Sequence, residues 1–157
     1  MATNVYDFEV KDLMGKTVKL SDYKGKVLLF VNIASRCGQT PQLDALENLY
    51  EKYRSRGFEV LAFPSNEFGN QEKGNEEVIH SFCKINYGVS FPLMPKSQVK
   101  KGLKQNRIFQ WLTDKEKNGW NNKAPSWNFC KYLVDEKGNL THFFEPAVEP
   151  ASIEKFI

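Results

Sequence analysis

The sequence lacks the cysteine pairs that would build a disulfide scaffold or a zinc site. Its three cysteines, Cys37, Cys83 and Cys130, lie far apart, and none is followed by a second cysteine three residues later. Disulfide-rich domains and zinc sites need closely paired cysteines, so neither class fits, and a reducing compartment is favoured. His80 and His142 have no ligand-like spacing, so we expect no metal ion.

Long apolar runs and a strong charge of one sign are also missing. No stretch approaches the length that spans a bilayer, and the start lacks the basic and apolar regions of a targeting signal. A net charge of +3 gives little reason to expect a nucleic-acid partner. We therefore expect a cytoplasmic protein. With 157 residues, 41% of them hydrophobic, the chain predicts one core and one domain, residues 1–157.

The most informative stretch that is present covers residues 27–40, VLLFVNIASRCGQT. Its first seven residues are the apolar run of a strand buried on both faces. Thr40 and Pro41 then supply a capping-type residue and a proline that a first helical turn tolerates. Cys37 therefore lies between a strand end and a helix start, where backbone N–H groups and the helix dipole favour an anion. We expect a nucleophile there.

The order of the remaining elements predicts an α/β fold of the thioredoxin-like class, with a central mixed sheet flanked by helices. A helix over residues 42–56 and a strand over 58–63 complete a βαβ unit, whose strands should be parallel neighbours. We expect further elements as follows: an N-terminal hairpin over residues 6–20, a loop over 64–74, a helix over 75–84 ending near Cys83, a short helix after Arg107, a loop over 113–126, a hairpin of strands 127–135 and 140–144, and a terminal helix over 152–157.

Three separated stretches then match one family: residues 32–40 (NIASRCGQT), 63–72 (FPSNEFGNQE) and 127–129 (WNF). They resemble the glutathione peroxidase family, and the similarity runs from about Val5 to the last residue. The resemblance implies that Cys37 is the peroxide-reactive residue of a cysteine-containing member. It also implies that Gln71, Trp127 and Asn128 complete the site.

The chemistry of these residue types agrees with those roles. A thiolate attacks a peroxide oxygen, and the leaving oxygen needs a donor as it becomes negative. Gln71, Trp127 and Asn128 all carry neutral N–H donors, which stabilise an anion without introducing a competing base. The product on Cys37 is a sulfenic acid, which a second thiol can convert to a disulfide before it is overoxidised.

Cys83 is the candidate for that second thiol. The stretch FCKINYG, residues 82–88, resembles the resolving segment of two-cysteine family members that use thioredoxin as reductant. A disulfide needs α-carbons within about 7 Å, so we expect the turn around Cys83 to unwind before a Cys37–Cys83 bond forms. Reduction by glutathione, or a sensor that passes its oxidation to a partner protein, are the alternatives. A dithiol oxidoreductase is disfavoured because Thr40 stands where the second thiol of its motif would be.

Some residues depart from the family pattern or carry weaker signals. Ser65 and Glu67 stand where cysteine and glutamine are common, and an inward-pointing Glu67 would oppose a thiolate. Cys130 is interpreted as a packing thiol. The basic segment, residues 96–107, is typical of a solvated face, with contact to anionic lipid or to an acidic patch of a reductant as the alternative. A segment typical of tetrameric members is not recognised there, so a monomer is expected.

Overall fold

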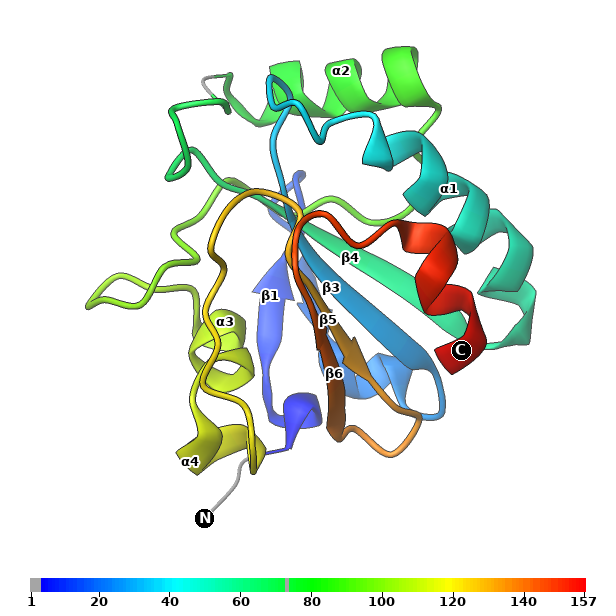
Figure 1. Ribbon diagram of the computed structural model, residues 1–157, viewed down its shortest axis with the longest axis vertical. Helices are drawn as coiled ribbons and strands as arrows, with labels where there is room; N and C mark the ends of the chain where they lie inside the picture. The colour runs from blue at the N-terminus through cyan, green and yellow to red at the C-terminus, as the bar shows by residue number, and fades with distance from the viewer. Residues whose placement is uncertain (1–3, 73) are drawn as a thin grey trace.

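The computed structural model describes residues 4–72 and 74–157, so Lys73 of the predicted loop and the first three residues lie outside it. A four-stranded sheet runs through the centre of the molecule (Figure 1). Its strand order is β4 (Phe58–Pro64), β3 (Val27–Ile33), β5 (Lys131–Val134) and β6 (Leu140–Phe144). β3 pairs parallel with β4 and antiparallel with β5, which confirms the predicted mixed sheet and its βαβ unit.

The strand register places three chain segments at one end of the sheet. Ile33 at the end of β3 lies opposite Pro64 at the end of β4, and Val31 lies opposite Lys131 at the start of β5. The loops that leave β3 and β4 therefore emerge beside the turn that enters β5. All the residues predicted to act on peroxide belong to these three segments.

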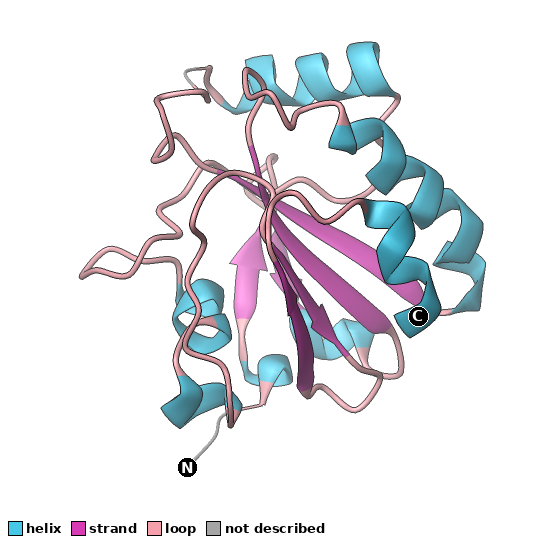
Figure 2. Ribbon diagram, viewed as in Figure 1, coloured by secondary structure: helices cyan, strands magenta, loops and turns pink. Residues whose placement is uncertain are grey.

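The two faces of the sheet are covered differently (Figures 1 and 2). Alternating side chains of β3 enter two hydrophobic clusters, as expected of a strand buried on both faces. The first cluster contains residues of α1 (Gln42–Tyr53), α2 (Glu76–Tyr87) and the 3-10 helix η4 (Pro150–Phe156). The second contains α3 (Arg107–Leu112) and parts of the N-terminal 3-10 segments η1 (Val5–Asp7) and η2 (Leu20–Tyr23).

The N-terminal hairpin is confirmed, as a two-stranded sheet of β1 (Glu9–Lys11) and β2 (Thr17–Lys19). Several predicted boundaries are wrong. The helix after β3 ends as a short 3-10 turn, η3 (Arg54–Arg56), before Gly57 at φ +82°. The predicted loop over residues 113–126 contains α4 (Lys115–Asn118). The terminal helix is 3-10 and begins at residue 150 rather than 152.

Two further corrections bear on the site. The C-terminal hairpin forms, but its first strand starts at Lys131 instead of Trp127, because Phe129 has a left-handed backbone at φ +70°. The helix predicted to end near Cys83 continues to Tyr87 and stops at Gly88, φ +63°. Cys83 therefore lies within α2 and not at its end. In the described part of the chain, no helix is both long and apolar enough to cross a bilayer.

Candidate active site

Cys37 lies in a hydrogen-bonded turn between β3 and α1. The Thr40 hydroxyl accepts the Cys37 N–H at 2.9 Å and donates to the Ala34 carbonyl at 2.8 Å. The predicted capping role of Thr40 is wrong, because Pro41 occupies the N-cap without a side-chain hydrogen bond. The backbone N–H of Gln39 points at the Cys37 sulfur, 3.3 Å away. With 8% of its surface exposed, the thiol has a fixed backbone, one N–H donor and limited access to solvent.

Gln71 and Asn128 are joined by a side-chain hydrogen bond. Asn128 is fully buried, and its Nδ2 donates to Gln71 Oε1 at 3.0 Å and to the Phe68 carbonyl at 3.4 Å. Gln71 in turn accepts the Arg36 N–H on its backbone carbonyl at 3.0 Å, which ties its loop to the turn that carries Cys37. Because Gln71 Oε1 is occupied by Asn128, its Nε2 hydrogens remain the donors that this amide can offer.

Trp127 is held by contacts from three directions. Its carbonyl accepts from Asn32 Nδ2 at 2.9 Å, and the Asn32 carbonyl accepts the Phe129 N–H at 2.6 Å. Its ring packs against Phe68 with centroids 5.8 Å apart, and 37% of the residue remains exposed. A Cβ at Gly69 would lie only 2.9 Å from the Trp127 ring, and Gly69 has φ +67°. Only glycine suits that position.

The sequence interpretation gave Asn32 no role, although a signal was present. Asn32 is a polar residue inside the apolar run of β3, and it is fully buried. A buried amide needs hydrogen-bond partners. Asn32 Nδ2 donates to the Trp127 carbonyl and the Asn32 backbone carbonyl accepts the Phe129 N–H, whereas Asn32 Oδ1 has no partner in the described part of the chain. It therefore positions that turn from the neighbouring strand.

The Glu67 carboxylate does not have the inward orientation that would oppose a thiolate at Cys37. Its Oε1 accepts the N–H of Val99, the N–H of Lys100 at 3.0 Å and the Ser65 hydroxyl at 3.1 Å. These bonds direct the carboxylate toward the basic segment. Lys100 also places its ammonium 4.8 Å from the centre of the Phe68 ring, so the basic segment borders the site.

The three thiols are all free, and the two besides Cys37 have contrasting positions. Cys83 is fully buried in the first cluster, which also contains Cys37. Burial, with a smaller contribution from the negative charge of Glu72, raises the pKa of Cys83 to about 12. Cys130 packs in the second cluster, with its sulfur 3.7 Å from the Ser126 hydroxyl, as expected of a packing thiol.

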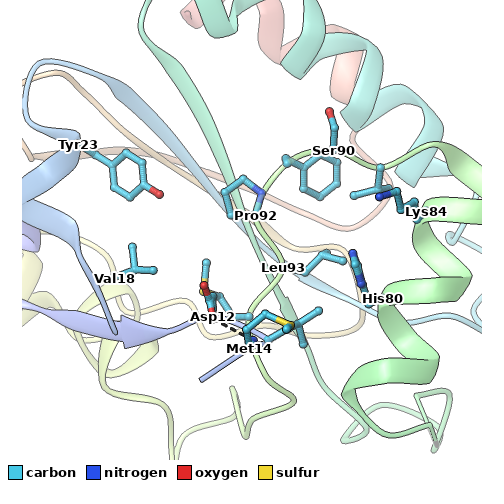
Figure 3. Close-up of a pocket in the computed structure, with 13 residues that line it drawn as sticks. Asp12, Met14, Val18, Tyr23, His80, Lys84, Ser90, Pro92 and Leu93 are labelled. Carbon is cyan, nitrogen blue, oxygen red and sulfur yellow. Dashed lines mark hydrogen bonds between the residues drawn. The ribbon is translucent and has the colours of Figure 1, made fainter. Parts of the chain in front are cut away.

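A cavity of about 460 Å³ lies apart from these residues (Figure 3). It opens between the N-terminal hairpin, which contributes Met14 and Val18, and α2, which contributes His80 and Lys84. None of its lining residues is Cys37, Gln71, Trp127 or Asn128. Among the described residues, no group of three or more Cys, His, Asp or Glu side chains is arranged to hold a metal ion.

Comparison with known proteins identifies the family of this chain. Residues 5–113 match the family model described as glutathione peroxidase. The chain belongs to the glutathione peroxidase family. One relative, the Saccharomyces cerevisiae protein called glutathione peroxidase-like peroxiredoxin 2, is 43% identical over 157 residues, which cover 100% of this chain and 96% of that protein. The resemblance of the three sequence stretches is thus confirmed, and the protein is a peroxidase, an oxidoreductase.

Solved structures support the same assignment and the fold. The crystal structure of Trgpx in its apo form superposes with a TM-score of 0.77 at 36% identity, over 100% of this chain and 94% of that chain. A thioredoxin-family thiol:disulfide interchange protein from Chlorobium tepidum matches with a TM-score of 0.67 at 16% identity, over 99% and 93% of the two chains. The second match concerns the fold alone, and it confirms the thioredoxin-like class for this family member.

Proposed function

We propose that Cys37 is the peroxide-reacting residue and that Gln71, Trp127 and Asn128 stabilise the charge that develops on the leaving oxygen. The Cys37 thiolate attacks the nearer peroxide oxygen, the O–O bond breaks, and water or an alcohol leaves after it gains a proton. Hydrogen peroxide and organic or lipid hydroperoxides are the substrates. The observation that carries this proposal is the Asn128–Gln71 hydrogen bond beside the Cys37 turn, since it leaves the Gln71 N–H groups as donors.

Cys83 then resolves the sulfenic acid. Its sulfur replaces the hydroxyl on Cys37, which gives a Cys37–Cys83 disulfide after α2 unwinds around Cys83. Thioredoxin reduces this disulfide and is the co-substrate, so the cycle uses no metal and no organic cofactor. The relative named a peroxiredoxin and the resolving-type segment at residues 82–88 support this version. Reduction by glutathione is the second candidate, in which Cys83 is dispensable.

The setting of this reaction is a monomeric, cytoplasmic enzyme whose whole chain acts as one domain, without a nucleic-acid partner. Lys96 and Lys100 border the site through the Glu72 carbonyl and the Phe68 ring respectively. This basic border suits an acidic patch on the reductant, and contact with an anionic membrane surface is the alternative.

Steady-state peroxide consumption tests this function. Wild type and Cys83→Ser are each supplied with thioredoxin and its reductase, and separately with glutathione. We expect wild type to turn over with thioredoxin and Cys83→Ser to lose that turnover. Equal thioredoxin-driven rates would overturn the resolving role, and equal glutathione-driven rates would support the second candidate. Slow turnover together with a mixed disulfide to a partner protein would identify a sensor instead.

A further inference from the structure

Lys131 carries a buried amino group that the peroxide step described above does not use. The residue is 0% exposed at the start of β5, where it lies opposite Val31 of β3. Its side chain lies on the same face of the strand as Leu133, which belongs to the first cluster together with Cys37. In the described part of the chain its ammonium group has no carboxylate at ion-pair distance. Burying a charge without such a partner is costly, so an apolar residue would be expected here unless the ammonium group is needed.

The ammonium group is bound by two backbone carbonyls of the segment that joins β6 to η4. Lys131 Nζ donates to the Pro146 carbonyl at 2.9 Å and to the Val148 carbonyl at 2.6 Å. Both acceptors lie between the end of β6 at Phe144 and the start of η4 at Pro150. Lys131 therefore fixes this irregular segment to the central sheet.

The Pro146 carbonyl also connects Lys131 to the first turn of α1. Gln42 Nε2 donates to the Pro146 carbonyl at 2.7 Å and to Gln39 Oε1 at 2.8 Å. Gln42 is 5% exposed, and these two bonds use both hydrogens of its amide nitrogen. Gln39 is the residue whose backbone N–H points at the Cys37 sulfur, 3.3 Å away. A continuous series of contacts thus runs from Lys131 to the turn that carries Cys37.

Lys131 keeps its charge at neutral pH in spite of its burial. Burial lowers the pKa of Lys131 to about 8, while Cys130 and Glu149 act in the opposite direction. At pH 7 about nine in ten of these amino groups are therefore protonated. Hydrogen bonds from a charged donor are shorter and stronger than those from a neutral one, which suits a group that fixes the Pro146 and Val148 carbonyls.

We propose that Lys131 is a positioning residue for Cys37. It fixes the Pro146 carbonyl, which orients the Gln42 amide, and that amide orients the side chain of Gln39. The Gln39 N–H is thereby kept aimed at the Cys37 sulfur, where a donor favours the thiolate that attacks peroxide. This inference rests on the proposed function, in which Cys37 is the peroxide-reacting residue. Lys131 itself takes no part in the bond changes.

Amide hydrogen exchange in the reduced protein, followed by NMR, tests this link without any peroxide. Lys131→Met removes the charge and its donors, and methionine fills much of the same space, so the fold should be kept. We expect the Gln39 N–H to exchange about tenfold faster in this variant, while the Phe30 N–H in β3 keeps its wild-type rate. Equal acceleration of both amides would show a global loss of stability, and an unchanged Gln39 rate would show no link. Either result would overturn the proposal.

Stopped-flow oxidation of Cys37 by hydrogen peroxide at pH 7 tests the consequence for the reaction. The second-order rate constant should fall roughly tenfold in Lys131→Met, because the donor beside the thiol is no longer held in place. Lys52→Met is the matched control and should react at the wild-type rate. Lys52 also ties the C-terminal region to α1, through Glu154 of η4, but it lies outside this series of contacts.

Three outcomes separate the role of Lys131 from the proposed function. A wild-type rate constant in Lys131→Met would overturn the positioning role, even if Gln39 exchanged faster. A tenfold loss in Lys52→Met would overturn it as well, since the effect would not be specific to this series. Failure of the proposed function would appear separately, as peroxide consumption that persists in Cys37→Ser, and the role of Lys131 in the reaction would then fall with it.

A second variant, Gln42→Leu, keeps the test independent of the folding of Lys131→Met. It interrupts the same series of contacts at α1, so it should speed Gln39 exchange and slow Cys37 oxidation by similar factors. In the double variant the two losses should not multiply, because the contacts act as one series. Losses that multiply would mean that Lys131 and Gln42 act separately, and the proposal would be overturned.

Discussion

Cys37 and Cys83 share one buried cluster, yet the groups around their sulfur atoms are of opposite kinds. The Cys37 sulfur receives a backbone N–H from Gln39 in a turn at the sheet edge. Cys83 is fully buried in the interior of α2, and the charge that reaches it is the negative charge of Glu72. Burial and that carboxylate both raise the pKa of Cys83. The fold therefore leaves Cys37 partly exposed with a backbone donor on its sulfur and encloses Cys83 completely.

The largest expected effect comes from removing the first thiol. In Cys37→Ser the hydroxyl is too weak a nucleophile to replace the thiolate, so peroxide consumption with thioredoxin should fall by more than about 10³-fold. Cys130→Ser is the control, since Cys130 packs in the other cluster and should leave the rate nearly unchanged. Comparable losses in both variants would contradict the assignment of Cys37 and with it the contrast between the two thiols.

The donors around Cys37 should give the next largest effect. Trp127→Phe removes the indole N–H but keeps an aromatic ring against Phe68, and Trp127 is partly exposed, so the fold should be preserved. Loss of one donor to a developing anion should slow Cys37 oxidation roughly tenfold to a hundredfold. Stopped-flow oxidation by hydrogen peroxide measures this. An unchanged rate constant at an unchanged Tm would show that the ring only packs.

Cys37 could be predicted from local sequence patterns, whereas Gln71 and Asn128 could not. Cys37 was identifiable because a buried strand, a turn and a helix leave strong local signals. Gln71 and Asn128 are amides in irregular segments, which local rules do not separate from other loop amides, so only the family resemblance singled them out. Their hydrogen bond joins residues 57 positions apart, and no local pattern encodes such a contact.

The error in the predicted start of the C-terminal hairpin also comes from a contact between residues far apart in the sequence. Trp127 and Phe129 are aromatic, and aromatic residues favour strands, yet the Phe129 N–H bonds to the Asn32 carbonyl and Phe129 adopts a left-handed backbone. A tertiary contact thus outweighs the local preference. The burial of Glu72 could not be predicted for a related reason, since Glu72 in a polar loop has the pattern of a solvated residue and its burial arises only in the fold.

Weakening the helix that restrains Cys83 should have a moderate effect. Asn75 caps α2 by accepting the Val78 N–H at 3.0 Å, and Asn75→Ala should cost about 1 kcal/mol of helix stability. If α2 must unwind before the disulfide forms, that change should accelerate bond formation about fivefold after a single addition of peroxide.

The matched control for this variant is Asn106→Ala. Asn106 caps α3 in the same way, with the Ile108 N–H at 2.9 Å, but α3 carries no site residue. It should lower Tm by a similar amount without accelerating the disulfide. Equal rates in Asn75→Ala, Asn106→Ala and wild type would mean that unwinding of α2 does not limit the resolving step.

The smallest expected effect concerns the stability contribution of Glu59, a buried carboxyl away from the site. Burial raises the pKa of the Glu59 carboxyl above its usual 4.5, while Lys26, Tyr50 and Arg54 act in the opposite direction. Between pH 4.5 and the folded-state pKa, folded protein keeps a proton that the unfolded chain has lost, so this group's contribution to stability declines as pH rises.

Glu59→Gln lacks this decline. Its free energy of unfolding relative to wild type should therefore increase from pH 4 to pH 8, as measured by urea titration at each pH. Peroxide turnover should stay at the wild-type level throughout, because Glu59 lies near the start of β4, at the other end of the strand from the loop that carries Gln71. A loss of turnover in Glu59→Gln would mean that this carboxyl affects the site through the fold.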